Sequence, residues 1–169
     1  MRNIYWLVLS GVIIFLDQIS KILAVNYLTF QTPKIIIPRF FNLYLDFNQG
    51  AAFSFLSQSG HWAEVSFLLL AAGVGLICFI FLLTQKNNAW KLNAGLACLM
   101  GGALGNGLDR LRLGHVVDFI QWYFGYWGNY FWPTFNLADS AICMGVGLII
   151  WGEFFKNKNK KILKIRDKK

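Results

Sequence analysis

The stretch VSFLLLAAGVGLICFIFLL covers residues 65–83 and has no charged side chain in its nineteen positions. A helix needs roughly 20 mostly apolar residues to cross the hydrocarbon core of a bilayer. The rest of the chain has a similar character: of its 169 residues 56% are hydrophobic and 14% are charged. Soluble domains carry about 25% charged residues, so we expect a multi-span membrane protein and exclude an ordinary soluble domain.

Four segments in all have the length and composition of membrane spans. They cover residues 4–25, 63–84, 89–108 and 133–155. Pro133 suits the first turn of the fourth helix, because the N–H that proline lacks would have no partner there. We expect a single domain over residues 1–169, with a basic tail at residues 156–169.

The first segment resembles a secretory signal peptide in one respect, since Arg2 precedes an apolar run. It is too long for a signal peptide, contains Asp17 and Lys21, and lacks a small-residue cleavage site. We therefore expect it to be retained as an anchor.

The basic residues predict the orientation, because cytoplasmic loops of membrane proteins are enriched in Lys and Arg. The net charge is +8, and most of it lies in the tail. If both termini are cytoplasmic, that side holds eleven basic residues, namely Arg2, Lys86, Lys91, Lys156, Lys158, Lys160, Lys161, Lys164, Arg166, Lys168 and Lys169. The outer side then holds four, namely Lys34, Arg39, Arg110 and Arg112. We expect the tail to lie on anionic lipid rather than on nucleic acid.

Two outward regions separate the predicted spans. In residues 26–61, the runs KIIIP (34–38) and FFNLYL (40–45) are rich in β-branched and aromatic side chains, which predicts a small sheet. Residues 109–132 contain eight aromatic side chains between Trp122 and Trp132. This density is expected of a segment at the lipid headgroup level, although packing alone also explains it.

Two aspartates, Asp118 and Asp139, lie in or beside segments apolar enough for a bilayer, where a lone charge costs on the order of several kcal/mol. At about 1.5 Å per residue, Asp17 lies roughly 20 Å along the first helix, in the outer half of the bilayer. A fourth helix that starts at Pro133 places Asp139 about 9 Å below its start. Asp109 ends the third span, so several segments bring carboxylates to one layer near the outer face.

Polar side chains also recur at helical spacing. Asp17 and Lys21 are four apart, Asn106 and Arg110 are four apart, and Asn136 and Asp139 are three apart. These pairs either line a site or form interhelical hydrogen bonds that hold the bundle, and the spacing leaves both open. The glycine pairs at residues 101 and 105 and at residues 145 and 147 predict helix packing.

Several chemistries are compatible with such a layer. Ser140 with His115 invites a serine triad, but the sequence has no GxSxG elbow. Two carboxylates from different segments fit an aspartic-protease arrangement better, because close like charges share one proton. The two histidines and the scattered cysteines give little support for zinc, so we expect no metal and no cofactor. A proton-coupled transporter and a structural membrane protein remain as rivals, although ionisable groups gathered at one face do not form a path across the bilayer.

Five motifs give the chain a close resemblance to the lipoprotein signal peptidases, the type II signal peptidase family of bacterial intramembrane aspartic proteases. They occur in family order over almost the whole chain. They are DQISK (17–21), NQGAAFS (48–54), GGALGNGLDR (101–110), VVDF (116–119) and FNLADS (135–140). Gly107 and Trp132 depart from the residues common in the family and touch no proposed chemical group.

The resemblance implies roles for ten residues. Asp118 and Asp139 are expected to form the catalytic dyad. The residues expected to bind substrate are Asn48, Gly50, Asn106, Arg110 and Asn136, and those expected to support the site are Asp17, Lys21 and Asp109. Arg110 is expected either to hold a substrate carbonyl or to pair with Asp109.

The family fold implies an all-α membrane protein with four transmembrane helices, an extracytoplasmic β-cradle and a short interfacial helix. The implied substrate is a prolipoprotein whose Cys carries a diacylglyceryl group, cut on the N-terminal side of that Cys. We expect a monomer in the bacterial cytoplasmic (inner) membrane, among phospholipids, with no nucleic-acid partner. Its termini would be cytoplasmic and its active site would face the outer leaflet.

Overall fold

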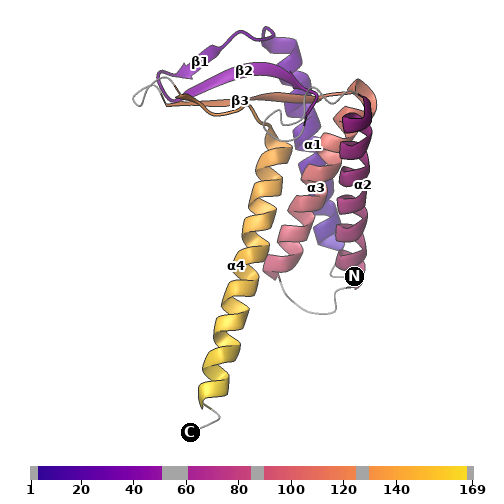
Figure 1. Ribbon diagram of the computed structural model, residues 1–169, viewed down its shortest axis with the longest axis vertical. Coiled ribbons are helices and arrows are strands. Elements are labelled where there is room, and N and C mark those ends of the chain that lie inside the picture. The colour runs from indigo at the N-terminus through magenta and orange to yellow at the C-terminus, as the bar shows by residue number, and fades with distance from the viewer. Residues whose placement is uncertain (1–3, 51–60, 85–89, 125–129, 167–169) are drawn as a thin grey trace.

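The computed structural model of the chain describes residues 4–50, 61–84, 90–124 and 130–166. Within these ranges the chain forms four long helices and one small antiparallel sheet. The helices are α1 (Ile4–Tyr27), α2 (His61–Thr84), α3 (Trp90–Leu113) and α4 (Leu137–Arg166). The sheet lies across one end of the helices, whereas α1 begins and α4 ends toward the opposite end (Figure 1).

Three of the helices are long and apolar enough to cross a membrane, over Ile4–Tyr27, Val65–Thr84 and Leu137–Phe154. Large apolar side chains such as Phe15, Leu69 and Ile150 are exposed on them. Such surfaces suit contact with lipid rather than water. The prediction of apolar helices is thus confirmed for three of the four segments, and membrane crossing by α3 stays a prediction.

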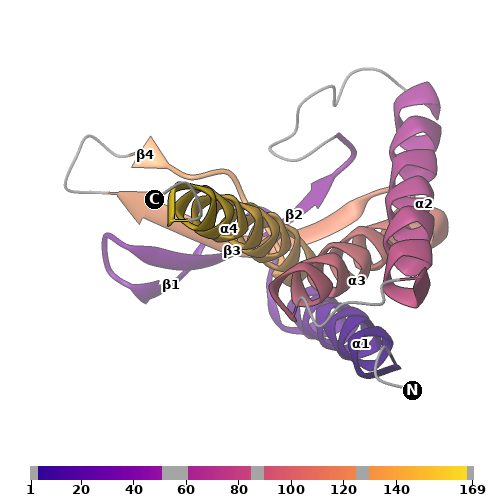
Figure 2. The same cartoon turned by 90° about the horizontal axis from the view of Figure 1, so that it is seen from below.

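Helix α3 is the central helix and packs against the other three (Figure 2). It is rich in buried small residues, which let the neighbouring backbones approach. A Cβ at Gly101 would lie 2.9 Å from Ile13 of α1, and a Cβ at Gly105 would lie 2.8 Å from an oxygen of Asp17. The predicted packing at these glycines is confirmed.

On α4, the two predicted packing glycines differ. A Cβ at Gly145 would lie 2.7 Å from the carbonyl oxygen of Gly95, which confirms close packing against α3. At Gly147 nothing lies within 4 Å of the added atom. The packing prediction is therefore wrong for Gly147, because residues two apart on a helix face different directions.

The sheet has the strand order β1-β2-β3-β4, with strands β1 (Lys34–Ile37), β2 (Phe41–Asn48), β3 (Val116–Phe124) and β4 (Tyr130–Phe131). The expected strands β1 and β2 are confirmed. Strand β3 pairs with β2 and was not predicted from the sequence, which assigned the aromatic segment to the headgroup level. Its β-branched and aromatic side chains favour a strand equally well once a partner strand is present.

One face of the sheet is fixed on the end of α1. Leu45 and Val117 pack there with Ala24, and Leu28 and Phe119 complete the cluster. Because successive side chains of a strand point to opposite faces, Asp118 points away from this cluster. The packing of β3 on α1 therefore determines where Asp118 faces.

The helix ends differ from the sequence expectation. Helix α4 begins at Leu137 rather than at Pro133, so Asp139 lies only about 3 Å along its axis instead of 9 Å. Helix α3 continues to Leu113, five residues past the expected end, and α4 continues through the expected tail to Arg166. The described part of the chain contains no short helix, and residues 51–60 and 125–129 lie outside it, so the interfacial helix stays a prediction.

A pair of glycine substitutions tests the packing of α3 on α4. In Gly102→Ala the new methyl group would collide with the carbonyl oxygen of Ala138 and lie 2.7 Å from Ile142. We expect a loss of about 1–3 kcal/mol of stability, typical of overpacking. Gly147→Ala has free space and should keep or raise the unfolding temperature in detergent. Equal unfolding temperatures for the two variants would contradict this packing.

Candidate active site

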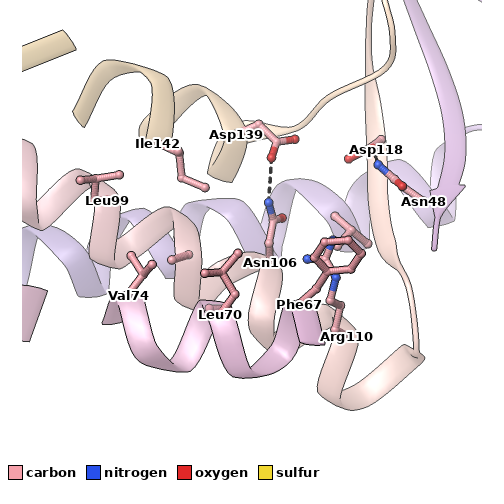
Figure 3. A pocket seen from close by; sticks show the side chains of 13 residues that line it. Asn48, Phe67, Leu70, Val74, Leu99, Asn106, Arg110, Asp118, Asp139 and Ile142 are labelled. Carbon is pink, nitrogen blue, oxygen red and sulfur yellow. Dashed lines mark hydrogen bonds between the residues drawn. The ribbon is translucent and has the colours of Figure 1, made fainter. Parts of the chain in front are cut away.

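A cavity of about 360 Å³ lies between α2, α3, α4 and the start of β3 (Figure 3). Most of its wall is apolar and comes from the three helices. The apolar lining consists of Phe67, Leu70, Ala71, Val74, Leu99, Ala103, Val116 and Ile142. The polar lining consists of Asn48, Asn106, Arg110, Asp118 and Asp139. The cavity thus has an extended apolar wall and a compact cluster of polar side chains, two of which are carboxylates.

Asp118 reaches the cavity from β3 and is 1% exposed. Its Oδ1 accepts a hydrogen bond from Nδ2 of Asn136 at 2.7 Å, and its Oδ2 accepts one from Nδ2 of Asn48 at 3.0 Å. The backbone N–H of Gly50 donates to Oδ1 of Asn48 at 2.9 Å, which fixes the direction of that amide. Both oxygens of the buried carboxyl group are therefore held by oriented donors.

Asp139 lies in the first turn of α4, and its Oδ1 accepts a hydrogen bond from Nδ2 of Asn106 at 2.8 Å (Figure 3). The Asp139 backbone N–H donates to Oδ1 of Asn136 at 3.0 Å, and the Asn136 N–H donates back to Oδ2 of Asp139 at 3.2 Å. This reciprocal pair is a capping box, which explains why the helix starts after Asn136. The predicted interaction of Asn136 with Asp139 is confirmed.

Asn136 is completely buried and touches both carboxyl groups. Its Nδ2 also contacts Oδ1 of Asn106 at 3.1 Å and the carbonyl of Val117 at 3.3 Å. Asn136 therefore connects the two carboxyl groups, binding Asp118 through its side-chain amide and Asp139 through its backbone N–H.

Beneath this group lies Lys21 of α1, which is 3% exposed. Its ammonium group forms salt bridges with Asp17 and Asp109, both at 2.8 Å, and donates to Oδ1 of Asn106 at 2.8 Å. The predicted pairing of Asp17 with Lys21 is confirmed. Two hydrogen bonds, both made by the side chain of Asn106, connect the buried cation to Asp139.

The two acidic partners of Lys21, Asp17 and Asp109, also hold other elements in place. Oδ1 of Asp17 accepts from the N–H of Ala138 at 2.9 Å, so a carboxylate of α1 lies at the N-terminus of α4. Oδ2 of Asp109 accepts from the N–H of Val117 at 3.2 Å, beside Asp118. Negative groups are favourable at helix N-termini, because the N–H groups there are unpaired and the dipole is positive.

Gln18 belongs to the same network and was not predicted as a site residue. Its Nε2 donates to Oδ1 of Asp109 at 2.8 Å and lies 3.2 Å from the carbonyl of Gly105. The sequence signal for Gln18 was its place next to Asp17 in DQISK. Helical spacing indicates contacts only between residues three or four apart on one helix, whereas the partners of Gln18 lie on α3.

Arg110 contributes a cation to the cavity wall. Its Nη2 donates to the carbonyl of Gly50 at 2.8 Å, and its guanidinium lies 5.2 Å from the ring centre of Phe67. The expected alternative of a pair with Asp109 is wrong, since the oxygens of Asp109 are taken by Gln18, Lys21 and the backbone of β3. Asn106 and Arg110, four residues apart on α3, both line the cavity, as their helical spacing predicts.

The surroundings of Asp118 change its acidity. Burial, together with the nearby charge of Asp139, raises the pKa of Asp118 from 3.8 to about 7. The hydrogen bonds from Asn48 and Asn136 act against this rise, because they favour the ionised form. Asp118 therefore gains or loses its proton near neutral pH.

The serine triad considered from the sequence has no matching geometry. The Ser140 hydroxyl donates to the carbonyl of Asn136 at 3.0 Å, within its own helix turn. The His115 ring packs on Phe47, with ring centres 4.5 Å apart. Across the described ranges, no group of three or more His, Cys, Asp or Glu side chains is arranged to hold a metal ion.

All ten residues singled out from the sequence are joined by hydrogen bonds or salt bridges into one network. It runs from Arg110 through Gly50 and Asn48 to Asp118, and then through Asn136, Asp139 and Asn106 to Lys21 with its two aspartates. The structure therefore brings all ten residues together at one site.

Known proteins with similar sequences carry names from one enzyme family. A family model described as signal peptidase (SPase) II matches residues 9–155. A lipoprotein signal peptidase of Xanthomonas campestris pv. campestris (strain 8004) is 46% identical over 158 residues, which cover 92% of this chain and 92% of that protein. One from Shewanella sp. (strain MR-4) is 46% identical over 160 residues, with 93% and 89% covered.

A solved structure described as that of a bacterial membrane enzyme has a similar fold. It superposes with a TM-score of 0.80 at 29% sequence identity, and the match covers 92% of this chain and 91% of the other. A second structure with the same description gives a TM-score of 0.71 at 29% identity, covering 86% and 90%. The likeness therefore extends over the helices and the sheet together.

Lys21→Met tests the buried charge network. Methionine is an unbranched side chain of similar length without the charge, so Asp17 and Asp109 lose their cation. We expect a loss of about 3–5 kcal/mol of stability, the usual cost of uncovering a buried charge. Thermal unfolding in detergent measures it, and Lys34→Met on the exposed strand β1 is the matched control. If both variants unfold at the same temperature, Lys21 does not hold the network together.

Proposed function

Because the chain belongs to the signal peptidase II family, which makes it a membrane protease acting on lipoprotein precursors, we propose that Asp118 and Asp139 are its catalytic dyad. They hydrolyse the peptide bond on the N-terminal side of a diacylglyceryl-modified Cys and so release the signal peptide. The observation that carries this proposal is the placement of two carboxyl groups, the buried Asp118 and the half-buried Asp139, at the polar end of an apolar cavity.

The chemistry follows from the behaviour of two close carboxyl groups. Like charges held together in a dry site cannot both ionise, so the pair shares one proton. The ionised member takes a proton from a water molecule as that water attacks the carbonyl carbon, and the protonated member donates a hydrogen bond to the carbonyl oxygen. The reaction needs no metal and no covalent intermediate. The amides of Asn48, Asn106 and Asn136 keep both carboxyl groups oriented without supplying or removing protons.

The cavity supports a lipid-bearing substrate. Its apolar wall, formed by side chains of α2, α3 and α4, suits acyl chains that enter from the surrounding bilayer. Arg110 lies at the polar end, where its guanidinium is positioned to donate to a carbonyl group of the substrate backbone. Asn48 lines the cavity beside Asp118, and Gly50 holds the Asn48 amide in place through its backbone N–H.

The same proposal gives a location for the reaction. All four helices cross the bacterial cytoplasmic membrane, with both termini in the cytoplasm and the dyad toward the outer leaflet. The basic end of α4 then lies near the anionic inner surface, as expected from the positive-inside rule. The sheet forms the extracytoplasmic cradle, and the enzyme acts as a monomer among phospholipids.

Replacing either member of the dyad by its amide tests the mechanism. Asp118→Asn and Asp139→Asn should each lower cleavage of a diacylglyceryl-modified precursor in detergent by at least about 10³-fold, since neither amide can transfer the proton. The helical circular dichroism spectrum should remain unchanged. Normal turnover in either variant rules out the dyad. A proton flux into liposomes that needs both residues would instead favour the transporter reading.

The pH profile tests the role of Asn48. Hydrolysis should decline as the pH rises past about 7, because Asp118 then loses its proton. Asn48→Ala removes a hydrogen bond that favours the ionised carboxylate, so the pKa rises and the declining limb moves up by about one pH unit. Measurement of kcat/KM from pH 5 to 9 reads out the shift. Gln49→Ala, an exposed neighbour, should leave the limb in place.

A further inference from the structure

A second cavity, of about 410 Å³, lies on the sheet and not between the helices. It is lined by Pro33, Tyr44, Asp46, Gln121, Phe131, Trp132, Pro133 and Thr134, and we call it the sheet groove. None of these residues lines the first cavity. The groove therefore has no part in the function proposed so far.

We propose that the sheet groove binds the polypeptide segment that follows the modified Cys of the substrate, and that Asp46 makes basic side chains preferred over acidic ones there. This inference rests on the proposed cleavage at the dyad. It adds a substrate preference on the mature side of the cut bond.

Strand β2 connects the two sites. Asp46 lies directly opposite Asp118 in the pairing of β2 with β3, so the two side chains share one face of the sheet. Asn48, two residues further along β2, lines the first cavity. Since strand residues rise about 3.4 Å each, a peptide leaving the dyad meets Asp46 within roughly one or two residues.

The places that the three parts of the substrate require favour the mature segment as the occupant of the sheet groove. The acyl chains need the apolar cavity, and the signal peptide is itself apolar and stays in the bilayer. The mature segment is the one that must leave the hydrocarbon. The sheet lies at the end of the molecule where it would emerge, away from the end of α4 (Figure 1). A groove with Tyr44, Phe131 and Trp132 beside polar groups suits an extended peptide at such a boundary.

The charge of the groove favours a cationic segment. Asp46 is half-buried, and within the described ranges its carboxylate accepts only the N–H of Phe47, at 3.0 Å, with no salt bridge. Nearby, Oε1 of Gln121 has one long contact of 3.4 Å with Asn42, whose own Oδ1 is buried without a described partner. The groove therefore offers acceptors and negative charge, which suit N–H groups and cations and oppose carboxylates.

The test uses three lipid-modified precursor peptides that differ only at the second and third positions after the Cys, where they carry Lys, Ser or Glu. For the full-length wild-type enzyme in detergent at low salt, we expect kcat/KM to be about two- to fivefold higher for Lys than for Glu, the range of a partly exposed ion pair. Asp46→Asn should bring the ratio to about one, and Asp46→Lys should invert it. High salt should reduce the wild-type ratio.

Two controls separate this inference from a general effect on charge or from failure of the dyad. Glu153→Gln removes the same charge in the middle of α4, about four turns from its start, and should keep the wild-type ratio. Cleavage of the Ser peptide by each variant gives the reference against which its Lys and Glu values are read. A wild-type ratio of one, or an unchanged ratio in Asp46→Lys, overturns the groove assignment even when Asp118→Asn is inactive and the dyad stands.

A second measurement does not depend on turnover. A precursor with a benzophenone side chain at the third position after the Cys is irradiated with the enzyme, and the labelled residues are mapped by mass spectrometry. We expect labels on Tyr44 and residues 131–134. Labels confined to α2, α3 and α4 overturn the proposal.

Discussion

The ammonium group of Lys21, buried among helices, is the constraint on which the rest of the site depends. A lone charge in such a place is unstable, so its donors must all be satisfied. They are taken by Asp17, Asp109 and Asn106. Each partner then fixes a different element: Asp17 caps α4, Asp109 holds the backbone of β3, and Asn106 orients Asp139. One cation, acting through these three partners, thus positions both carboxyl groups at the cavity.

The division of the molecule into a helical part and a sheet explains why the cavity has two characters. Apolar side chains of the helices form most of the cavity wall, whereas β2 and β3 carry Asn48 and Asp118 to the polar end. The central helix α3 takes part in both, since small residues line its contacts and Asn106 and Arg110 lie near its end. A single cavity therefore combines an apolar wall with a polar end that holds two carboxyl groups.

Much of this arrangement was predictable, and the errors have physical causes. Hydropathy located α1, α2 and α4, and the motif residues do lie together. Strand β3 was missed because an aromatic run suits both a lipid interface and a strand, and only its pairing with β2 decides between them. The start of α4 was misplaced because proline tolerance is a weaker signal than the capping box of Asn136 and Asp139. Gln18 was missed because its partners lie on α3, far away in the sequence.

The capping box gives Asp139 two duties. Its side chain closes the first turn of α4 and also faces the cavity. An apolar side chain at this position would therefore remove the hydrogen bond to the Asn136 N–H, at a cost of about 0.5–2 kcal/mol, in addition to removing a carboxyl group from the cavity. Invariance of this position across natural variants would therefore reflect folding and chemistry together. A ligand that draws the Asp139 carboxylate away from Asn136 would have to break the hydrogen bond that caps α4. The position of this side chain is therefore fixed by the helix itself.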